Sequence, residues 1–314
     1  MNDIIPATPL LNQPALTARL GVARVWVKDE SKRALGNFKS LGGTAAAEAA
    51  LDRAGPGVAM LICASDGNHG LAVAAAAQAR GVQARIYLPV SVASARVDRI
   101  AACGAGIVRV DGTYDQAVDA ARHAAAAGEG LLIPDTSDDA DDPVVADVLA
   151  GYGRIPREIV TQLDGDRPTH LFVQAGVGGL AAAMSTGFRY VHGDDLTIMS
   201  VEPAAAACVA AGLAAGRPVQ IGGALETCAD MLSCGLASAG ALATLLRAGC
   251  RPITVSEEAL LEAVDAMEHC AGLRTTASGA AGLAGALVAA GDRHRAEELG
   301  LTPSSRILLL MTER

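Results

Sequence analysis

The sequence predicts an α/β protein built from two mostly parallel sheets. Short β-like runs alternate with alanine-rich helical stretches along the 314 residues. This alternation implies right-handed βαβ units whose sheets are covered by helices on both faces. Four of the runs fall between residues 58 and 133, and the others lie outside that window. We therefore expect two αβα lobes, with the smaller lobe (53–135) inserted in the larger one (1–52 and 136–314).

Each expected strand is a short β-like run, and each expected helix is a longer stretch rich in alanine. The strands are expected at Val25–Val27, Val58–Ala64, Ala84–Leu88, Gly106–Val110, Leu131–Ile133, His170–Gln174, Thr197–Val201 and Arg306–Met311. The helices are expected from Thr44 onward and at Leu71–Arg80, Ser94–Cys103, Tyr114–Ala127, Leu180–Tyr190 and Glu257–Cys270.

Composition and charge argue against several classes of protein. Hydrophobic residues make up 51% of the chain and aromatic residues only 3%, so we expect a core of Ala, Val and Leu with helices close to the sheets. The net charge of −9 argues against nucleic-acid binding, because no Lys/Arg cluster could neutralise a phosphate backbone. The longest stretch without Asp, Glu, Lys or Arg, residues 168–188, is interrupted by polar residues and is not typical of a membrane span. Residues 1–6 lack the features of a signal peptide, so we expect a cytoplasmic protein.

The cysteines and histidines do not have the spacing of a metal site. The seven cysteines are odd in number, lie mostly in apolar segments and form no Cys-x-x-Cys pair, and the six histidines are scattered. We therefore expect no bound metal and interpret the cysteines as small buried hydrophobic residues in a reducing compartment.

The most informative segment is Gly36–Gly43, which places Lys39 between an aromatic residue, Phe38, and a Gly-Gly pair. A lysine near a helix start is usually solvated. Phe38 predicts partial burial, however, and a desolvated lysine has the lowered pKa that a Schiff-base nucleophile requires. The two glycines allow another backbone or a flat ring to approach closely. Lys39 is therefore a candidate for a catalytic residue.

A second polar motif, Ser65–Gly70, follows an apolar strand and precedes a helix. Exposed N–H groups are expected at such a turn. A structural turn explains the glycines equally well, but it does not explain an adjacent Asp66, Asn68 and His69. Asp66 and Asn68 are therefore candidates for the site.

A third motif lies between an expected strand and an expected helix, the geometry that holds a phosphate with backbone N–H groups and the helix dipole. It consists of Gly176, Val177, Gly178, Gly179 and Leu180, after Gln174. The same motif also satisfies a relaxed dinucleotide fingerprint, with Glu202 near the expected position of a ribose-binding acid. The dinucleotide interpretation leaves Lys39 and the 65–70 loop unexplained, so we favour a different phosphate-bearing cofactor over NAD.

Asp135 follows the expected strand Leu131–Ile133 after a single residue, Pro134, and so is placed to point into a cleft. The acidic residues after it, up to Asp147, are interpreted as a solvated loop. No calcium loop is present, because the residue expected to be Gly is Ala140 or Pro143.

Together, the segments around Lys39 and Asn68 resemble the pyridoxal-phosphate enzymes of the tryptophan-synthase-β (fold type II) superfamily. The Asp-Gly-Asn-His-Gly loop that begins at Asp66 is similar to that of the diaminopropionate ammonia-lyases. The resemblance covers nearly the whole chain. It implies pyridoxal 5'-phosphate in the cleft between the lobes, a Schiff base at Lys39, a small amino acid as substrate and a homodimer.

The resemblance also implies roles for individual residues. Asn68 would hydrogen-bond the phenolic oxygen of the cofactor, and Thr312, in a Thr-Glu pair at the end of the last strand, would face the pyridine nitrogen. A neutral hydroxyl cannot hold that nitrogen protonated, which favours elimination over transamination. Asp66 and Asp135, 69 residues apart, would be the two substrate-facing aspartates of the diaminopropionate lyases. They would serve as bases for the D- and L-isomer respectively, with Lys39 an alternative base.

The chain also departs from the diaminopropionate lyases. It is short, Ala277 stands where a Glu usually precedes Ser-Gly, and the segment after Thr136 lacks the aromatic residue and glutamate of that group. We expect α,β-elimination on a small amino acid, with 2,3-diaminopropionate as the first candidate. A serine/threonine-type dehydratase and a pyridoxal-phosphate binding protein without turnover remain alternatives.

Overall fold

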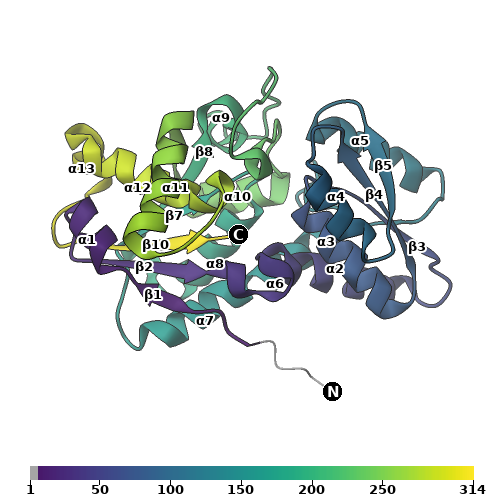
Figure 1. Ribbon diagram of the computed structural model, residues 1–314, viewed down its shortest axis with the longest axis horizontal. Coiled ribbons are helices and arrows are strands. Elements are labelled where there is room, and N and C mark those ends of the chain that lie inside the picture. Colours follow the sequence, from purple (N-terminus) through teal and green to yellow (C-terminus); the bar gives the residue numbers. More distant parts are fainter. Residues whose placement is uncertain (1–5) are drawn as a thin grey trace.

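The computed structural model describes residues 6–314, so the expectation for the N-terminal residues 1–5 lies outside the described part of the chain. Two sheets form the framework. A six-stranded sheet has the strand order β1-β2-β10-β7-β8-β9, and a four-stranded sheet has the order β5-β4-β3-β6. All pairings are parallel except that of β1 with β2. The expected fold of two parallel-sheet αβα regions is therefore confirmed (Figure 1).

The strands are β1 (Leu10–Asn12), β2 (Arg24–Asp29), β3 (Met60–Ala64), β4 (Gln83–Pro89), β5 (Gly106–Val110), β6 (Leu131–Leu132), β7 (His170–Gln174), β8 (Thr197–Pro203), β9 (Arg251–Val255) and β10 (Arg306–Met311). All eight expected strands are present. β1 and β9 were not expected, because β1 is only three residues long and Pro252 interrupts the apolar pattern of β9. Both are edge strands of the larger sheet, where proline is tolerated.

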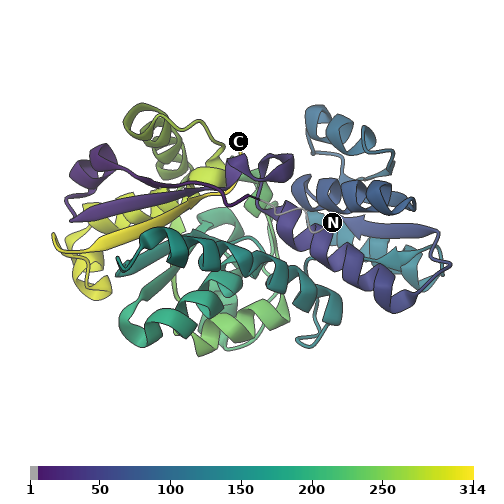
Figure 2. The same ribbon diagram turned by 90° about the horizontal axis from the view of Figure 1, so that it is seen from below.

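Helices cover both sheets. They are α1 (Pro14–Leu20), α2 (Lys39–Ala54), α3 (Asn68–Arg80), α4 (Ser94–Ala101), α5 (Tyr114–Ala126), α6 (Pro143–Tyr152), α7 (Arg154–Leu163), α8 (Gly179–His192), α9 (Cys208–Ala215), α10 (Ala239–Arg247), α11 (Glu257–Ala271), α12 (Ala277–Gly291) and α13 (Arg293–Leu299). Figure 2 shows the two sheet regions side by side, each with helices on its faces. None of the helices in residues 6–314 is both long and apolar enough to cross a membrane.

The larger sheet is buried on both faces because its strands alternate between two hydrophobic clusters. On β2, Val25 and Val27 pack in one cluster with α1, α11 and α12, whereas Trp26 packs in the other. On β10, Leu309 and Leu308 divide in the same way. Such continuous apolar runs are typical of parallel strands covered on both faces.

Small residues let α12 lie directly on the larger sheet. A Cβ atom added to Gly282 would lie 2.8 Å from the carbonyl oxygen of Phe172, and one added to Gly285 would lie 2.5 Å from Cγ2 of Val201. Both distances are shorter than van der Waals contact, so no larger residue fits without a shift. The close helix-to-sheet approach expected from the alanine-rich composition is confirmed here.

The chain enters the smaller sheet after β2 and returns to the larger one at β7, so the four strands β3 to β6 form a continuous insertion. The boundaries that we predicted, after residues 52 and 135, stay a prediction.

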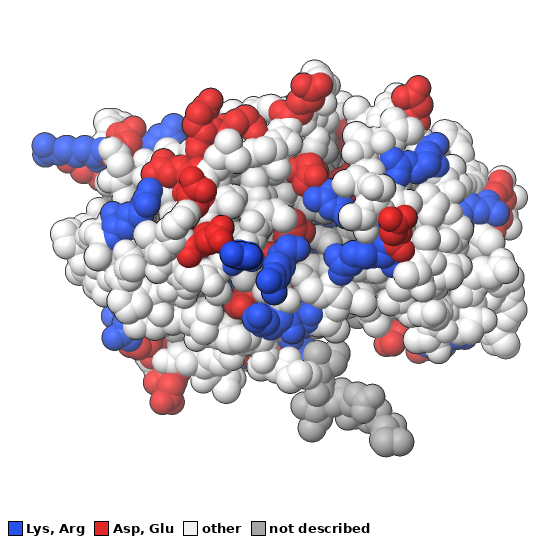
Figure 3. All heavy atoms as spheres, viewed as in Figure 1, with Lys and Arg blue, Asp and Glu red and all other residues white. Residues whose placement is uncertain are grey.

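On the face drawn in Figure 3, acidic and basic side chains are interspersed.

Candidate active site

A cavity lies where residues from the two sheet regions meet. Asp66 follows β3, Asp135 follows β6, Gly176 follows β7 and Thr312 follows β10, so each comes from the carboxyl end of a parallel strand. Ligands of α/β proteins bind at this end of the strands. All the site residues named from the sequence line the cavity: Phe38, Lys39, Asp66, Asn68, Asp135, Gly176, Val177, Gly178, Gly179, Leu180 and Thr312.

Lys39 is the first residue of α2, and its backbone N–H is capped by the side chain of Asn37 at 3.0 Å. The two glycines after it do allow close approaches. A Cβ at Gly42 would lie 2.4 Å from the ring of Tyr152. A Cβ at Gly43 would lie 2.6 Å from the Cβ atom of Ala72 on α3. The flat ring that approaches is thus a tyrosine of this chain. The glycines position α2, and with it Lys39, against its neighbours.

The ammonium of Lys39 is paired with a carboxylate. Its Nζ lies 2.5 Å from Oδ2 of Asp135, and the hydroxyl of Tyr114 donates to Oδ1 of the same residue at 2.5 Å. Burial disfavours both charges, but their mutual attraction and hydrogen bonding outweigh it. They hold the pKa of Lys39 above its usual value and that of Asp135 below. Our expectation that desolvation lowers the Lys39 pKa is wrong for this structure, because it omitted the buried partner.

The pKa of Asp66 is shifted in the opposite direction to that of Asp135. Burial, opposed by Lys39 and supported by the negative charge of Asp135, raises the pKa of Asp66 to about 8. The cavity therefore contains one carboxylate paired with lysine and a second that holds its proton at neutral pH. Two carboxyl groups with separated pKa values are a feature of acid–base sites.

The 65–70 loop divides into residues that shape the turn and residues that face the cavity. Ser65 Oγ accepts hydrogen bonds from the N–H groups of Gly67 and Gly70, both at 2.8 Å, and Gly67 has a φ of 140°, which only glycine adopts readily. His69 is buried, and its Nε2 lies 2.8 Å from the carbonyl oxygen of Ile133. It thereby ties α3 to the chain two residues before Asp135.

Asn68 has a partner that we did not expect. Its Nδ2 donates to the carboxylate of Glu313, which also accepts from Thr276 Oγ1 at 2.6 Å. Glu313 is buried and lines the cavity. The amide therefore has one N–H held by Glu313 and a second left for a ligand in the cavity.

The glycine segment after β7 forms an open helix start. Gly178 has a φ of 93° and is the N-cap of α8, and no side chain within residues 6–314 caps this helix start. A Cβ at Gly176 would lie 3.2 Å from Cys234 Sγ, so this backbone position is tight. Free N–H groups at a helix start suit a phosphate.

The dinucleotide interpretation fails on Glu202. Its carboxylate is fully buried and accepts hydrogen bonds from the N–H groups of Val209 and Ala210, at 2.7 and 2.8 Å. It caps α9 and is not among the residues that line the cavity beside Lys39, so it is not placed to bind a ribose there.

Several cavity residues were missed from the sequence. Tyr114, after β5, could have been found from its place at the carboxyl end of a strand, as Asp135 was. Tyr152 packs its ring 5.0 Å from that of Phe38, and no sequence signal points to it. Gln174 and Glu313 belong to motifs that we identified but were not assigned a contact.

The residues present fit pyridoxal 5'-phosphate. The amine of Lys39 opens into the cavity with 23% of its side chain exposed, as covalent attachment requires. The uncapped start of α8 suits the phosphate, and the Thr312 hydroxyl suits a ring nitrogen.

Comparison with known proteins gives relatives that are an ammonia-lyase and a dehydratase. Diaminopropionate ammonia-lyase of Escherichia coli (strain K12) is 32% identical over 259 residues, which cover 73% of this chain and 62% of that protein. Biosynthetic L-threonine dehydratase of Mycobacterium bovis is 29% identical over an alignment of 321 positions, gaps included, that covers 98% of this chain and 68% of that protein. The chain thus matches less than two thirds of the length of the first of these relatives.

Structural similarity extends over the whole chain. The crystal structure of the Escherichia coli diaminopropionate ammonia lyase with an aminoacrylate-PLP azomethine reaction intermediate has a TM-score of 0.88 and 28% identity, and the match covers 99% of this chain and 85% of that one. The family model for pyridoxal-phosphate dependent enzymes matches residues 1–313. The chain therefore belongs to the pyridoxal-phosphate dependent enzyme family.

Proposed function

We propose that the protein is an ammonia-lyase that removes the β-substituent of a small amino acid, and that its substrate is 2,3-diaminopropionate. The observation that carries this proposal is the set of Lys39, Asp66 and Asp135 in one cavity. Two carboxyl groups beside one amine favour a substrate with a second ammonium, because opposite charges attract strongly in a site of low dielectric. By family analogy, we also propose a cytoplasmic homodimer.

Each residue then has a chemical task. Lys39 would hold the cofactor through its Nζ, Asn68 would donate to its phenolic oxygen and the N–H groups at Gly178 and Gly179 would hold its phosphate. When bound, pyridoxal phosphate supplies an electron sink for the electrons left at Cα. Asp135, ionised at neutral pH, would accept the α-proton of the L-isomer, with Tyr114 holding the carboxylate in place.

Asp66 would play the matching part for the D-isomer. With its pKa near 8, it releases its proton when a substrate ammonium comes close or when the pH rises. The released aminoacrylate hydrolyses to pyruvate and ammonia in solution, so no further residue is needed for that step.

The test is release of α-keto acid from D- and L-diaminopropionate, serine, threonine and β-hydroxyaspartate. We expect the highest kcat/KM with diaminopropionate. A preference for serine or threonine would identify a dehydratase instead, which the similarity to threonine dehydratase supports as the second candidate. If no keto acid is released from any of them by cofactor-loaded protein, the protein binds the cofactor without turnover.

Replacing each aspartate by asparagine separates the two roles. Asparagine keeps the shape but removes the base, and loss of a general base costs about a hundred- to ten-thousand-fold in rate. Asp66→Asn should lower kcat/KM for D-diaminopropionate more than for the L-isomer, and Asp135→Asn should do the reverse. Equal losses for both isomers would make Lys39 the only base.

A further inference from the structure

Gln174, the last residue of β7, is surrounded by oxygen atoms. It is 3% exposed and lines the cavity. Its Nε2 lies near four oxygens: Ser278 O at 3.2 Å, Gly279 O at 3.0 Å, Leu310 O at 3.3 Å and Thr312 Oγ1 at 3.2 Å. Its Oε1 is buried and has no hydrogen-bond partner among the described residues. An amide with a crowded NH2 group and an unpaired oxygen is not placed for stability alone.

The surrounding carbonyl groups determine which way the amide points. A carbonyl oxygen can only accept, so three of the four neighbours require the NH2 group on that side. Two of the carbonyls belong to α12 and one to β10, both buried elements. Rotation of the Gln174 amide by half a turn would bring Oε1 against three carbonyl oxygens, which excludes the reversed orientation.

This orientation fixes the direction of the Thr312 hydroxyl. Nε2 of Gln174 can only donate, so Thr312 Oγ1 accepts from it, and the single hydroxyl hydrogen is left to point elsewhere. Thr312 is 3% exposed and lines the cavity. The cavity is therefore where that hydrogen finds an acceptor.

We propose that Gln174 is a positioning residue that makes the Thr312 hydroxyl a donor to the ring nitrogen of the cofactor and so keeps that nitrogen unprotonated. The proposal rests on the proposed placement of the ring against Thr312. A protonated ring nitrogen would need an acceptor there, and the buried hydroxyl hydrogen of Thr312 would then lose its partner. A reversed Gln174 amide would take that hydrogen and let Thr312 accept, so the orientation of one glutamine decides between the two states.

The experiment follows the ring nitrogen itself. Holoenzyme is prepared with cofactor carrying 15N in the ring, and the 15N chemical shift is recorded against pH. In the wild type we expect the shift of an unprotonated pyridine across the neutral range. In Gln174→Met, which keeps length but removes the donor, we expect the apparent pKa of the ring nitrogen to rise by about one unit, the tenfold change that corresponds to one hydrogen bond.

Two matched variants distinguish the possible explanations. Thr312→Val removes the hydroxyl and should move the 15N profile at least as far as Gln174→Met. His170→Leu removes a buried hydrogen bond of another residue on β7. In the wild type, His170 Nε2 lies 3.1 Å from the carbonyl oxygen of Leu299, and His170 does not line the cavity. It should lower stability without moving the profile. If Gln174→Met does not fold, Gln174→Asn withdraws the amide by one methylene and should give the same shift.

The outcomes separate this proposal from the proposed function. Thr312→Val could change the pH dependence of the 15N chemical shift while the Gln174 variants do not. The positioning role of Gln174 would then be overturned, and the placement of the ring against Thr312 would stand. If Thr312→Val leaves the profile unchanged, the ring nitrogen does not face Thr312, and both the positioning role and that part of the site are overturned. Neither result depends on which amino acid is the substrate.

Discussion

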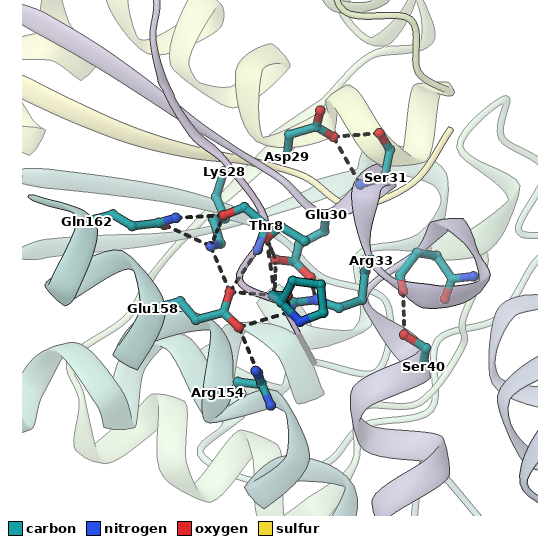
Figure 4. Close-up of polar contacts among 12 residues, drawn as sticks. Thr8, Lys28, Asp29, Glu30, Ser31, Arg33, Ser40, Arg154, Glu158 and Gln162 are labelled. Atoms are coloured by element: carbon teal, nitrogen blue, oxygen red, sulfur yellow. Dashed lines mark hydrogen bonds and ion pairs between the residues drawn. The ribbon is translucent and has the colours of Figure 1, made fainter. Parts of the chain in front are cut away.

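Within the described residues, two lysine–carboxylate clusters differ in what surrounds them. In the cavity, Lys39 pairs with Asp135. Below β2 lies a second cluster, here named the buried ion network, which Figure 4 shows between β2 and α7. Its members are Thr8, Lys28, Glu30, Arg33, Arg154, Glu158 and Gln162.

Within the buried ion network, the lysine is fully enclosed. Lys28 is fully buried, and its Nζ donates to Glu158, to Gln162 and to the backbone oxygen of Thr8, all within 2.9 Å. Burial tends to raise the pKa of Glu158, but hydrogen bonds from Arg33, Lys28 and Arg154 outweigh it and lower the pKa to about 2. Each of the three N–H donors of the Lys28 ammonium therefore has a partner, and none is exposed.

The cavity cluster is open on one side. The side chain of Lys39 is 23% exposed, whereas that of Lys28 is 0% exposed. Burial raises the pKa of Asp66 to about 8, because the positive charges of Lys39 and Arg96 do not offset it. The comparison teaches that a buried charge by itself does not indicate chemistry. A charge pair with one side facing a cavity, next to a second group of separated pKa, does.

The largest expected effect on turnover comes from replacing Lys39, the lysine that lines the cavity. Lys39→Ala should lower turnover by more than about ten-thousand-fold, because it removes the covalent attachment and a base together. Borohydride reduction of the wild type should attach the cofactor permanently to the peptide that contains Lys39. It should also abolish the visible absorbance of the bound cofactor. Lys28→Met is the matched control and should leave that label in place. A label on Lys28, or none on cofactor-loaded protein, would contradict the assignment.

Breaking the buried ion network should lower the free energy of unfolding without changing kcat. Arg33→Met leaves Glu30 and Glu158 without their main cation, and removal of one partner of a buried ion pair typically costs about 3–5 kcal/mol. Urea unfolding should show this loss, while kcat of the folded, cofactor-loaded variant stays close to that of the wild type. A large fall in kcat without a change in unfolding free energy would place the network in the catalytic machinery.

The two aspartates should respond to pH in opposite ways. The folded-state pKa of Asp66, about 8, lies above the value of about 3.9 in an unfolded chain, so only the folded state holds this proton between those values. Its contribution to the stability of cofactor-free protein is therefore present at low pH and lost as the pH rises towards 8. Asp66→Asn should gain stability relative to the wild type from pH 5 to pH 8, as urea unfolding can measure.

Asp135→Asn provides the contrast. The folded-state pKa of Asp135 is lowered, so its contribution is present above its unfolded pKa and is lost only on acidification. This variant should be destabilised by a similar amount at pH 5 and pH 8. The same dependence on pH in both variants would show that the two carboxyl groups do not differ.

The smallest expected effect is at Tyr114. Tyr114→Phe keeps the ring but removes the hydrogen bond to Asp135, and a hydrogen bond to a charged group contributes about 1.5–3 kcal/mol. We expect kcat/KM for the L-isomer to fall by roughly ten- to a hundred-fold, with a smaller change for the D-isomer. If both isomers are affected equally, Tyr114 acts on Lys39 or the cofactor and not through Asp135.

The sequence alone determined the two parallel sheets, because strand and helix periodicity are local and eight strands carry clear apolar runs. It also determined the glycine loop at Gly176–Gly179 and the polar residues that follow β3 and β6, because the carboxyl ends of parallel strands meet at one edge. Short or proline-containing edge strands, such as Arg251–Val255, were missed because their local signal is weak.

Only the tertiary structure decided which charges meet. Lys39 and Asp135 are 96 residues apart, and their contact reverses the direction of the lysine pKa that burial alone would give. Gln174 and Thr312 are 138 residues apart, and three backbone carbonyls that no pattern locates orient the amide between them. Electrostatic and hydrogen-bond energies depend on distances between atoms, and sequence patterns constrain those distances only within one element.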